Sequence, residues 1–411
     1  MNHPAYYNDA YTTHFESTIL EFTEYDGRPA VVLEQTYFYP TSGGQPHDTG
    51  RLIQTGITMN VLEIVERKID NAILHIVDIP PGSGTVRGEI DWPRRFDHMQ
   101  HHTGQHILSQ AFIRVAAAET VGFHLSEQRV TIDLEHSNLT DDQLQAAEQL
   151  ANEIVWENRS VHIREVRSEE AGNLPLRKIP PARDGHLRLI NVDNFDLTAC
   201  GGTHVDRTGA VGLIKIVKTE HRGTITRIEF CCGRRAIEDY RLKHEVINDL
   251  SSYLTTGYSE LVPSVLRLRD EAKQLRQELK RQQKALLELE AQQLVEKSES
   301  LGSLKLVKSV FPERGVDEVR LLGNSLASQI GVIALLGIYG NESKLIFCRS
   351  ADAPGVMGDI IHPALERLGS ARGGGGPAFA QGGGPPADME TVTEAIALAE
   401  QRLREVLNGI E

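Results

Sequence analysis

The chain has 411 residues, of which 40% are hydrophobic and 24% are charged, and its net charge at pH 7 is −14. This length favours two or three domains, and the composition is typical of a globular protein. Four cysteines are too few for a disulfide framework, no run approaches 18 apolar residues, and the first residues do not resemble a signal peptide. We therefore expect a cytoplasmic protein that does not contact a membrane.

Residues 1–90 are expected to form a small β domain. Runs of alternating or β-branched residues predict strands at 15–22, 30–34, 59–64 and 72–77. A stretch rich in glycine and proline, Phe38–Gly50, lies between the second and third of these strands. Such a composition is usually that of a turn.

A helix is predicted at residues 100–118, after a boundary at Pro93. His102 and His106 share one face of this helix, and the main apolar residues cluster on the opposite side. This placement argues against the interpretation that these two histidines are ordinary core residues.

A second motif lies about a hundred residues further on, as Cys200-Gly201-Gly202-Thr203-His204. Its thiol and imidazole complete a borderline-soft ligand set that suits zinc. We therefore predict a Zn²⁺ site whose ligands are His102, His106, Cys200 and His204.

The motif does not predict the role of the zinc. A zinc metalloprotease helix would carry glutamate after the first histidine, but Thr103 occupies that position. Four protein ligands suit a closed structural site, whereas catalytic zinc usually keeps one position open. A structural and a catalytic role both remain open.

The zinc motifs are expected to lie in an α+β domain at residues 91–240. Thr140 begins a predicted helix that runs to about residue 159, with Gln143 in the position of a capping box. Strands are predicted at 128–134, 161–166, 187–192, 212–220 and 226–232. The second motif is expected on a loop.

Residues 241–302 are predicted to form a helical hairpin or coiled coil. A first helix at 237–254 ends at a turn, and a heptad seam follows. The seam contains Leu261, Val265, Leu268, Ala272, Leu275, Leu279, Leu286 and Leu289. The two arms could pair in an antiparallel hairpin, or the long arm could pair between molecules, so a homodimer through this region or the C-terminal region is possible.

Residues 303–411 alternate between strand and helix and predict a small α/β domain. Strands are expected at 304–311, 332–339 and 344–349, and helices at 317–329, 359–368 and 388–407. A glycine loop at 372–384 is too varied for a flexible linker. Its backbone amides could hold phosphate groups.

Taken together, these motifs resemble those of the AlaX-type alanyl-tRNA editing proteins, in the long form, and of the editing and C-terminal domains of alanyl-tRNA synthetases. The chain departs from the family motifs at two glycines, since Gly104 replaces an alanine and Gly376 replaces a basic residue. The resemblance implies an N-terminal β-barrel, a zinc-dependent editing domain and a C-terminal tRNA-binding domain shared with DHH-type phosphoesterases. The catalytic half of those phosphoesterases is not found in the sequence.

The resemblance also implies a reaction, hydrolysis in trans of the ester that joins serine or glycine to alanine tRNA. Nothing before residue 90 is large enough for an aminoacylation domain, so we do not expect the chain to charge tRNA. A site that hydrogen-bonds a substrate hydroxyl would discriminate strongly against alanine. The candidate catalytic residues are Thr103, Gln105, Gly201, Gly202 and Thr203. The family places its glycine-rich motif near the pocket, which makes Ser42, Gly43, Gly44 and Gln45 the candidate selectivity loop.

The net negative charge does not exclude tRNA, because local basic patches determine where nucleic acid binds. The candidate tRNA-binding residues are Arg177, Lys178, Lys218, Arg222, Arg227, Arg372, Gly373, Gly374 and Gly375. Two other functions remain open: a zinc-stabilised tRNA-binding module without catalysis, and a metal-dependent hydrolase of small esters or amides.

Overall fold

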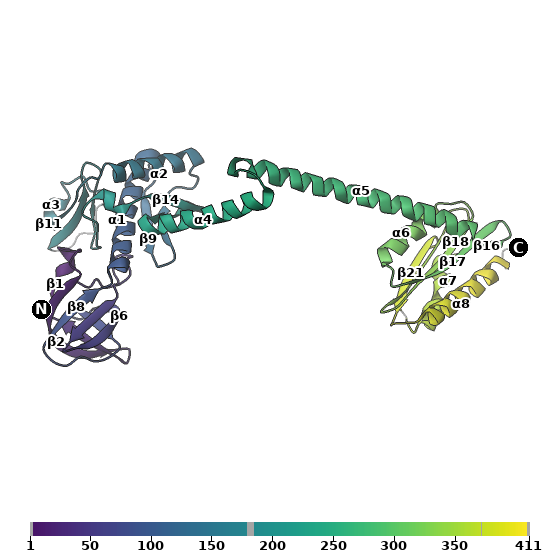
Figure 1. Ribbon diagram of the computed structural model, residues 1–411, viewed down its shortest axis with the longest axis horizontal. Coiled ribbons are helices and arrows are strands. Elements are labelled where there is room, and N and C mark those ends of the chain that lie inside the picture. Colours follow the sequence, from purple (N-terminus) through teal and green to yellow (C-terminus); the bar gives the residue numbers. More distant parts are fainter. Residues whose placement is uncertain (1–2, 179–184, 371, 409–411) are drawn as a thin grey trace. The chain divides into compact units, whose positions relative to one another are not determined.

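The computed structural model describes residues 3–178, 185–370 and 372–408 (Figure 1). The chain divides into two compact units, Met1–Tyr253 and Leu254–Glu411. None of the helices that the structure describes combines the length and the apolar character needed to cross a membrane.

The first unit begins with a closed six-stranded barrel, which confirms the expected β domain. Its strand order is β2-β3-β7-β6-β5-β8. The strands are β2 (His14–Tyr25), β3 (Arg28–Leu33), β5 (Gly50–Gln54), β6 (Ile57–Arg67), β7 (Ala72–Val77) and β8 (Thr85–Ile90). The sequence missed β5 and β8, which carry few apolar residues. In β8, Gly88 makes room for the Phe15 ring, since a Cβ on this glycine would lie 2.5 Å from that ring.

Short segments flank the barrel strands. Strand β1 (His3–Pro4) pairs in parallel with β4 (Gln35–Thr36), and η1 (Ala5–Tyr7) follows β1. These segments bring the beginning of the chain close to the loop between β4 and β5.

Helix α1 (Trp92–Ala116) carries the histidine motif and begins eight residues before the predicted start. The Asp91 side chain caps it by accepting a hydrogen bond from the Arg94 N–H, and Pro93 lies in the first turn, where its missing N–H has no cost. Leu108, Ala111 and Phe112 are fully buried in the core of this region.

Helix α1 packs against an antiparallel sheet and a second helix. The sheet order is β14-β15-β10-β9, from β9 (Thr120–Leu125), β10 (Val130–Leu134), β14 (Ile214–Arg222) and β15 (Ile225–Cys232). Helix α2 (Asp141–Trp156) begins with the predicted capping box, in which Thr140 and Gln143 bond each other's backbone.

A second, three-stranded sheet lies in the same unit. It contains β11 (Val161–Arg167), β12 (His186–Val192) and β13 (Asp196–Ala199), and the short helices α3 (Ser168–Ala171) and η2 (Thr208–Val211) lie along the same stretch of the chain. Strands β9 and β13 were not predicted. The second zinc motif follows β13 directly, on a loop as expected.

Two long helices and one short 3-10 helix occupy most of the region predicted as a hairpin or coiled coil. Helix α4 (Gly233–Leu254) belongs to the first unit, whereas η3 (Tyr258–Glu260) and α5 (Leu261–Glu296) belong to the second. The seam residues Leu275, Leu279 and Leu286 are more than half exposed. The pairing of this seam stays a prediction.

The second unit contains the predicted α/β domain. Its six-stranded sheet has the order β16-β17-β18-β19-β21-β20. Helix α6 and the end of α5 cover one face, and α7 and α8 cover the other. The elements are β16 (Glu299–Leu301), β17 (Leu304–Pro312), α6 (Val316–Ala327), β18 (Val332–Tyr339), β19 (Ser343–Arg349), α7 (Met357–Arg367), β20 (Gly373–Gly375), β21 (Phe379–Gly384) and α8 (Met389–Asn408).

The prediction of a glycine loop at 372–384 was wrong, because most of this stretch forms the paired strands β20 and β21. Glycines here permit close contact between backbones. A Cβ on Gly375 would lie 2.2 Å from the Phe379 carbonyl oxygen.

Candidate metal centre

The four predicted ligands converge in the first unit. One ligand atom from each of His102, His106, Cys200 and His204 lies within 4.8 Å of the others. The Cys200 Sγ atom lies 3.2 Å from His102 Nε2 and 3.3 Å from His204 Nε2. A tetrahedral zinc site, with Zn–N near 2.1 Å and Zn–S near 2.3 Å, would separate its ligands by about 3.4–3.6 Å. The residues therefore fit a zinc ion.

His102 and His106 are buried, with exposed fractions of only 2% and 3%, although the sequence placed them on the face of the helix opposite the apolar residues. Their face of α1 is away from the apolar core, but the barrel loop before β5 and the loop after β13 cover it. Cys200 and Gly201 remain partly exposed and mark the side open to solvent.

Each of the three imidazoles has a partner for its Nδ1 atom. His102 Nδ1 lies 2.8 Å from the Gln45 Oε1 atom, and His204 Nδ1 lies 3.1 Å from the Thr103 hydroxyl. His106 Nδ1 lies 3.4 Å from the Asp196 carboxylate. Partners of this kind fix the orientation of a metal-binding imidazole and leave Nε2 for the metal.

A buried ion pair extends this set beyond the imidazoles. The Asp196 side chain is fully buried and lies 3.0 Å from the Arg177 Nε atom, whose side chain is 11% exposed. Arg177 was predicted to bind tRNA, but the structure pairs its guanidinium with a carboxylate that contacts a candidate ligand.

The electrostatic surroundings favour a thiolate at Cys200. Burial by itself would raise the pKa of this thiol, but the nearby imidazoles of His102 and His204 outweigh burial, so that the pKa lies well below its ordinary value. Thiolate is the form of cysteine that binds metals. The backbone N–H of Gly202 also donates to this sulfur, at 3.3 Å.

Arg188 holds the loop that carries Cys200. Its Nη1 group donates to the carbonyl oxygens of Cys200 and Gly202, at 2.8 and 3.0 Å, and its Nε group donates to the Tyr7 carbonyl at 3.0 Å. Nothing in its local pattern indicated that it organises the loop.

The structure explains why the second motif has glycine at position 202. A Cβ at this position would lie 2.1 Å from the Cε1 atom of His102. Only glycine therefore allows the loop to approach the imidazole this closely.

The rim of the centre is formed by small and aromatic residues. The Phe123 ring lies 5.2 Å from the His102 ring, measured between centroids, and a Cβ on Gly44 would lie 3.0 Å from the Phe123 ring. The candidate selectivity loop therefore lies beside a residue that packs against a candidate ligand.

Comparisons with known proteins relate parts of the chain to tRNA synthetases. A family model described as the threonyl and alanyl tRNA synthetase second additional domain matches residues 187–229, and one described as tRNA synthetases class II (A) matches residues 10–94. The alanine–tRNA ligase of Pyrococcus furiosus is 34% identical over 82% of this chain and 37% of the ligase. That of Methanoregula boonei is 34% identical over 93% of this chain and 42% of the ligase.

The chain resembles AlaX-type proteins and the editing domains of alanyl-tRNA synthetases. It spans between 37% and 43% of the length of the curated relatives it matches. Another of them, the alanine–tRNA ligase of Halorubrum lacusprofundi, is 31% identical over 97% of this chain. The crystal structure of the C-Ala domain from Aquifex aeolicus alanyl-tRNA synthetase covers 25% of this chain and 96% of its own, with 23% identity and a TM-score of 0.22.

The candidate catalytic residues differ in how close they lie to the metal centre. Thr103 and Thr203 are fully buried beside the centre, and Gly201 and Gly202 lie in the loop that carries Cys200. Gln105 is not brought to the centre, because its amide donates to Ser109 at 2.8 Å.

Three candidate tRNA-binding residues lie on the outer face of the sheet formed by β9, β10, β14 and β15. Lys218, Arg222 and Arg227 line a cavity of about 250 Å³ there, and each is paired with a carboxylate of Glu220 or Asp133. Lys178 is exposed at the end of a described segment.

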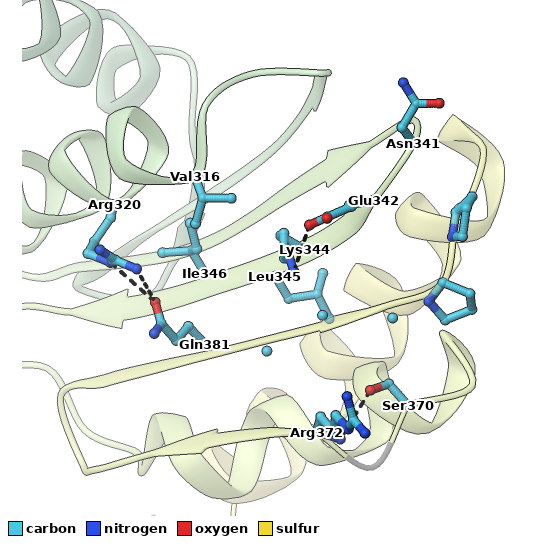
Figure 2. A pocket seen from close by; sticks show the side chains of 15 residues that line it. Val316, Arg320, Asn341, Glu342, Lys344, Leu345, Ile346, Ser370, Arg372 and Gln381 are labelled. Carbon is cyan, nitrogen blue, oxygen red and sulfur yellow. Dashed lines mark hydrogen bonds and ion pairs between the residues drawn. The ribbon is translucent and has the colours of Figure 1, made fainter. Parts of the chain in front are cut away.

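The second unit holds a larger cavity of about 670 Å³, shown in Figure 2. Arg320, Lys344 and Arg372 bring positive charge to it, and Gly382–Gly384 form part of its wall. Gly373, Gly374 and Gly375 form β20, beside this wall. Arg372 is thus the only one of the four candidates in this domain that lines the cavity among the described residues.

Proposed function

We propose that this AlaX-like chain is a zinc-containing hydrolase that removes serine or glycine from alanine tRNA by cleaving the aminoacyl ester. The observation that carries the proposal is the convergence of three buried imidazoles and one thiol, beside the partly exposed residues Cys200 and Gly201. The similarity to alanine–tRNA ligases over most of the chain supports alanine tRNA as the carrier. We propose that the chain acts in trans and does not aminoacylate tRNA.

The candidate ligands for zinc are His102, His106, Cys200 and His204. Zinc bound there would supply a Lewis acid that polarises a carbonyl or lowers the pKa of a water molecule. Thr103 accepts a hydrogen bond from the Val205 N–H and contacts His204, so we assign it a positioning role.

Substrate selection is proposed to lie at the rim. Ser42, Gly43 and Gly44 are exposed, and a Cβ on Gly44 would meet the Phe123 ring, which packs against the His102 ring. Glycines at this point leave room for backbone to approach the amino acid. We propose that the basic residues Lys178, Lys218, Arg222 and Arg227, with Arg372 in the second unit, contact the tRNA backbone.

The deciding experiment measures release of labelled amino acid from alanine tRNA charged with serine, glycine or alanine. We expect release of serine or glycine to exceed release of alanine. Purified protein should contain one zinc per chain, and a Cys200→Ala, His204→Ala double variant should lose both zinc and hydrolysis.

The same assay separates the alternatives. Binding of tRNA without release of any amino acid would instead favour a zinc-stabilised binding module. Equal hydrolysis of charged tRNA and of small amino-acid esters would favour a general esterase. A parallel assay with alanine, ATP and uncharged tRNA should give no charged product.

A further inference from the structure

Gln45 links three separate segments of the first unit. Its side chain is fully buried and lies between His102 on α1 and Thr203 in the loop after β13, although Gln45 itself belongs to the barrel loop before β5. The Oε1 atom lies 2.8 Å from His102 Nδ1 and accepts a hydrogen bond from the Thr203 N–H at 3.1 Å. The Nε2 group donates to the Thr203 hydroxyl at 2.8 Å.

These contacts determine the tautomer of His102. A backbone N–H can only donate, so the Gln45 atom that faces Thr203 N must be the carbonyl oxygen. His102 Nδ1 faces the same oxygen, which can only accept, and therefore carries the proton. The His102 Nε2 atom, which points towards Cys200 Sγ, is then left with its lone pair.

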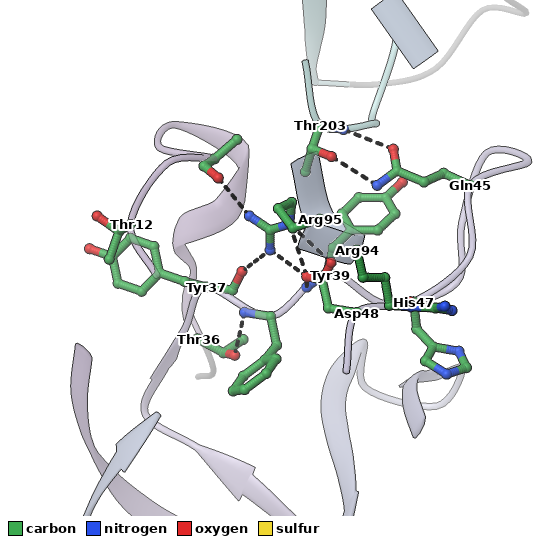
Figure 3. Close-up of polar contacts among 12 residues, drawn as sticks. Thr12, Thr36, Tyr37, Tyr39, Gln45, His47, Asp48, Arg94, Arg95 and Thr203 are labelled. Carbon is green, nitrogen blue, oxygen red and sulfur yellow. Dashed lines mark hydrogen bonds and ion pairs between the residues drawn. The ribbon is translucent and has the colours of Figure 1, made fainter. Parts of the chain in front are cut away.

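The loop that presents Gln45 is itself fixed to α1, as Figure 3 shows. Arg95 and Asp48 form an ion pair in which both side chains are fully buried, and Arg95 also donates to the carbonyl oxygens of Ala10 and Tyr37. Asp48 accepts a hydrogen bond from the Tyr39 N–H at 2.7 Å. One helix therefore carries both the anchor of the loop and the histidine that the loop contacts.

The local conformation of the loop aims Gln45 inwards. Ser42 and Gln45 exchange two backbone hydrogen bonds, at 2.9 and 3.1 Å. Gly43 and Gly44 occupy the tip with φ of +56° and +81°, values that favour glycine. The Leu125 N–H donates to the Gly44 carbonyl and ties the tip to β9.

We infer that Gln45 is a positioning residue for the metal centre, and that through it the docking of the barrel and the affinity for zinc depend on each other. This inference rests on the metal centre of the proposed function. A partner on the second nitrogen of a metal-binding imidazole typically changes metal affinity by about 10–100-fold. Coupling between two binding events is reciprocal, so zinc should also hold the barrel loop in place.

The test compares zinc affinity in the full chain and in three variants by competition with a chelator. Gln45→Leu removes the acceptor and should weaken zinc binding by about 10–100-fold. Gln45→Glu keeps an acceptor for both His102 and Thr203 and should stay within about tenfold of the unmodified chain. Gln54→Leu makes the same chemical change elsewhere in the barrel and should leave zinc affinity unchanged, because the Gln54 amide donates to the carbonyls of Ser83 and Thr85 and not to the metal centre.

Two further readouts do not depend on hydrolysis. The absorption bands of the cobalt-substituted protein should shift in Gln45→Leu and not in Gln54→Leu. Removal of zinc should speed amide hydrogen exchange at residues 41–48 in the unmodified chain, and this difference should disappear in Gln45→Leu.

An unchanged zinc affinity and cobalt spectrum in folded Gln45→Leu would overturn the inference. Equal weakening in Gln45→Glu and Gln45→Leu would also overturn it, because the acceptor would then not be the cause. If circular dichroism shows that Gln45→Leu does not fold, Gln45→Met takes its place with the same expected loss. Zinc binding is measured without tRNA, so a failure of the proposed hydrolysis would leave this result standing.

Discussion

Arg177 shows how one contact changes the interpretation of a basic residue. Its place in a basic stretch predicted contact with tRNA, yet its guanidinium lies beside the buried Asp196 carboxylate, which contacts His106. Removing one partner of a buried pair leaves an uncompensated charge, which is costly. Arg177 therefore supports the metal centre through Asp196.

We expect Arg177→Gln to lower the free energy of unfolding by on the order of 2 kcal/mol and to lower kcat. KM for charged tRNA should change little. Lys178→Gln is the matched control, because Lys178 is exposed. It should leave the melting temperature unchanged and raise KM in a way that depends on salt. If Arg177→Gln raises KM and leaves the melting temperature unchanged, Arg177 binds tRNA and does not support the metal centre.

At the scale of elements, the loop before β5 connects the barrel to the metal centre. Its two glycines are not equivalent. A Cβ on Gly43 would meet nothing within 4 Å, whereas a Cβ on Gly44 would contact Phe123. The structure thus offers two substitutions that share backbone strain and differ in contact with the rim.

Gly44→Ala should change the ratio of serine to alanine hydrolysis by about tenfold, because the added methyl group displaces the Phe123 ring that packs against His102. Gly43→Ala should lower stability by about 1 kcal/mol through backbone strain and change this ratio less. Zinc content should be unaltered in both. Equal ratios in the two variants, with lowered melting temperatures, would assign the loop to scaffolding alone.

The barrel contains a buried histidine with a predictable effect on stability. His75 bonds the Thr36 hydroxyl and the Val31 carbonyl, and burial lowers its pKa to about 4. In the unfolded chain the His75 imidazole has a pKa near 6.5. Between about pH 4 and pH 6.5 the unfolded chain therefore binds more protons than the folded chain. The stabilisation is therefore complete above pH 6.5 and is lost as the pH falls towards 4.

We expect the contribution of His75 to the free energy of unfolding to fall by about 2 kcal/mol between pH 7.5 and pH 5. Urea unfolding followed by tryptophan fluorescence measures it, since Trp92 and Trp156 both lie in the first unit. In His75→Met the free energy of unfolding should fall by about 2 kcal/mol less between pH 7.5 and pH 5 than in the unmodified chain, whatever the stability of the variant at pH 7.5. An identical pH dependence in the variant would show that the folded chain binds a proton at His75 without cost.

At the scale of the whole molecule, the two compact units have separate cores. The sequence placed a boundary at residue 240, but that position lies inside α4, and the compact units divide after Tyr253. All four candidate ligands, together with Gln45 and Asp196, belong to the first unit.

A chain that ends at Leu254 should therefore keep zinc and turnover at saturating tRNA, while KM for charged tRNA rises by about tenfold, equivalent to about 1.4 kcal/mol of lost binding. Hydrolysis kinetics of the full and shortened chains check this. Loss of turnover in a folded, zinc-loaded shortened chain would show that the second unit takes part in catalysis.

The sequence alone determined what local periodicity and motif spacing encode. Residues 102 and 106 are one helical turn apart, so their shared face followed from the sequence, and the capping box at Thr140 followed in the same way. The alternation of strands and helices after residue 303 was also readable, because those strands are buried and strongly apolar.

Only the tertiary structure decided which groups support the ligands. Gln45, Arg188 and Asp196 reach the centre from three different elements, and Gln45 lies 57 residues from His102 along the chain. Such contacts depend on strand register and on how the barrel docks against α1, and neither leaves a local pattern in the sequence. The same reason separates Arg177 from Lys178: they are neighbours in sequence, but only Arg177 has a buried carboxylate in contact with its side chain among the residues that the structure describes.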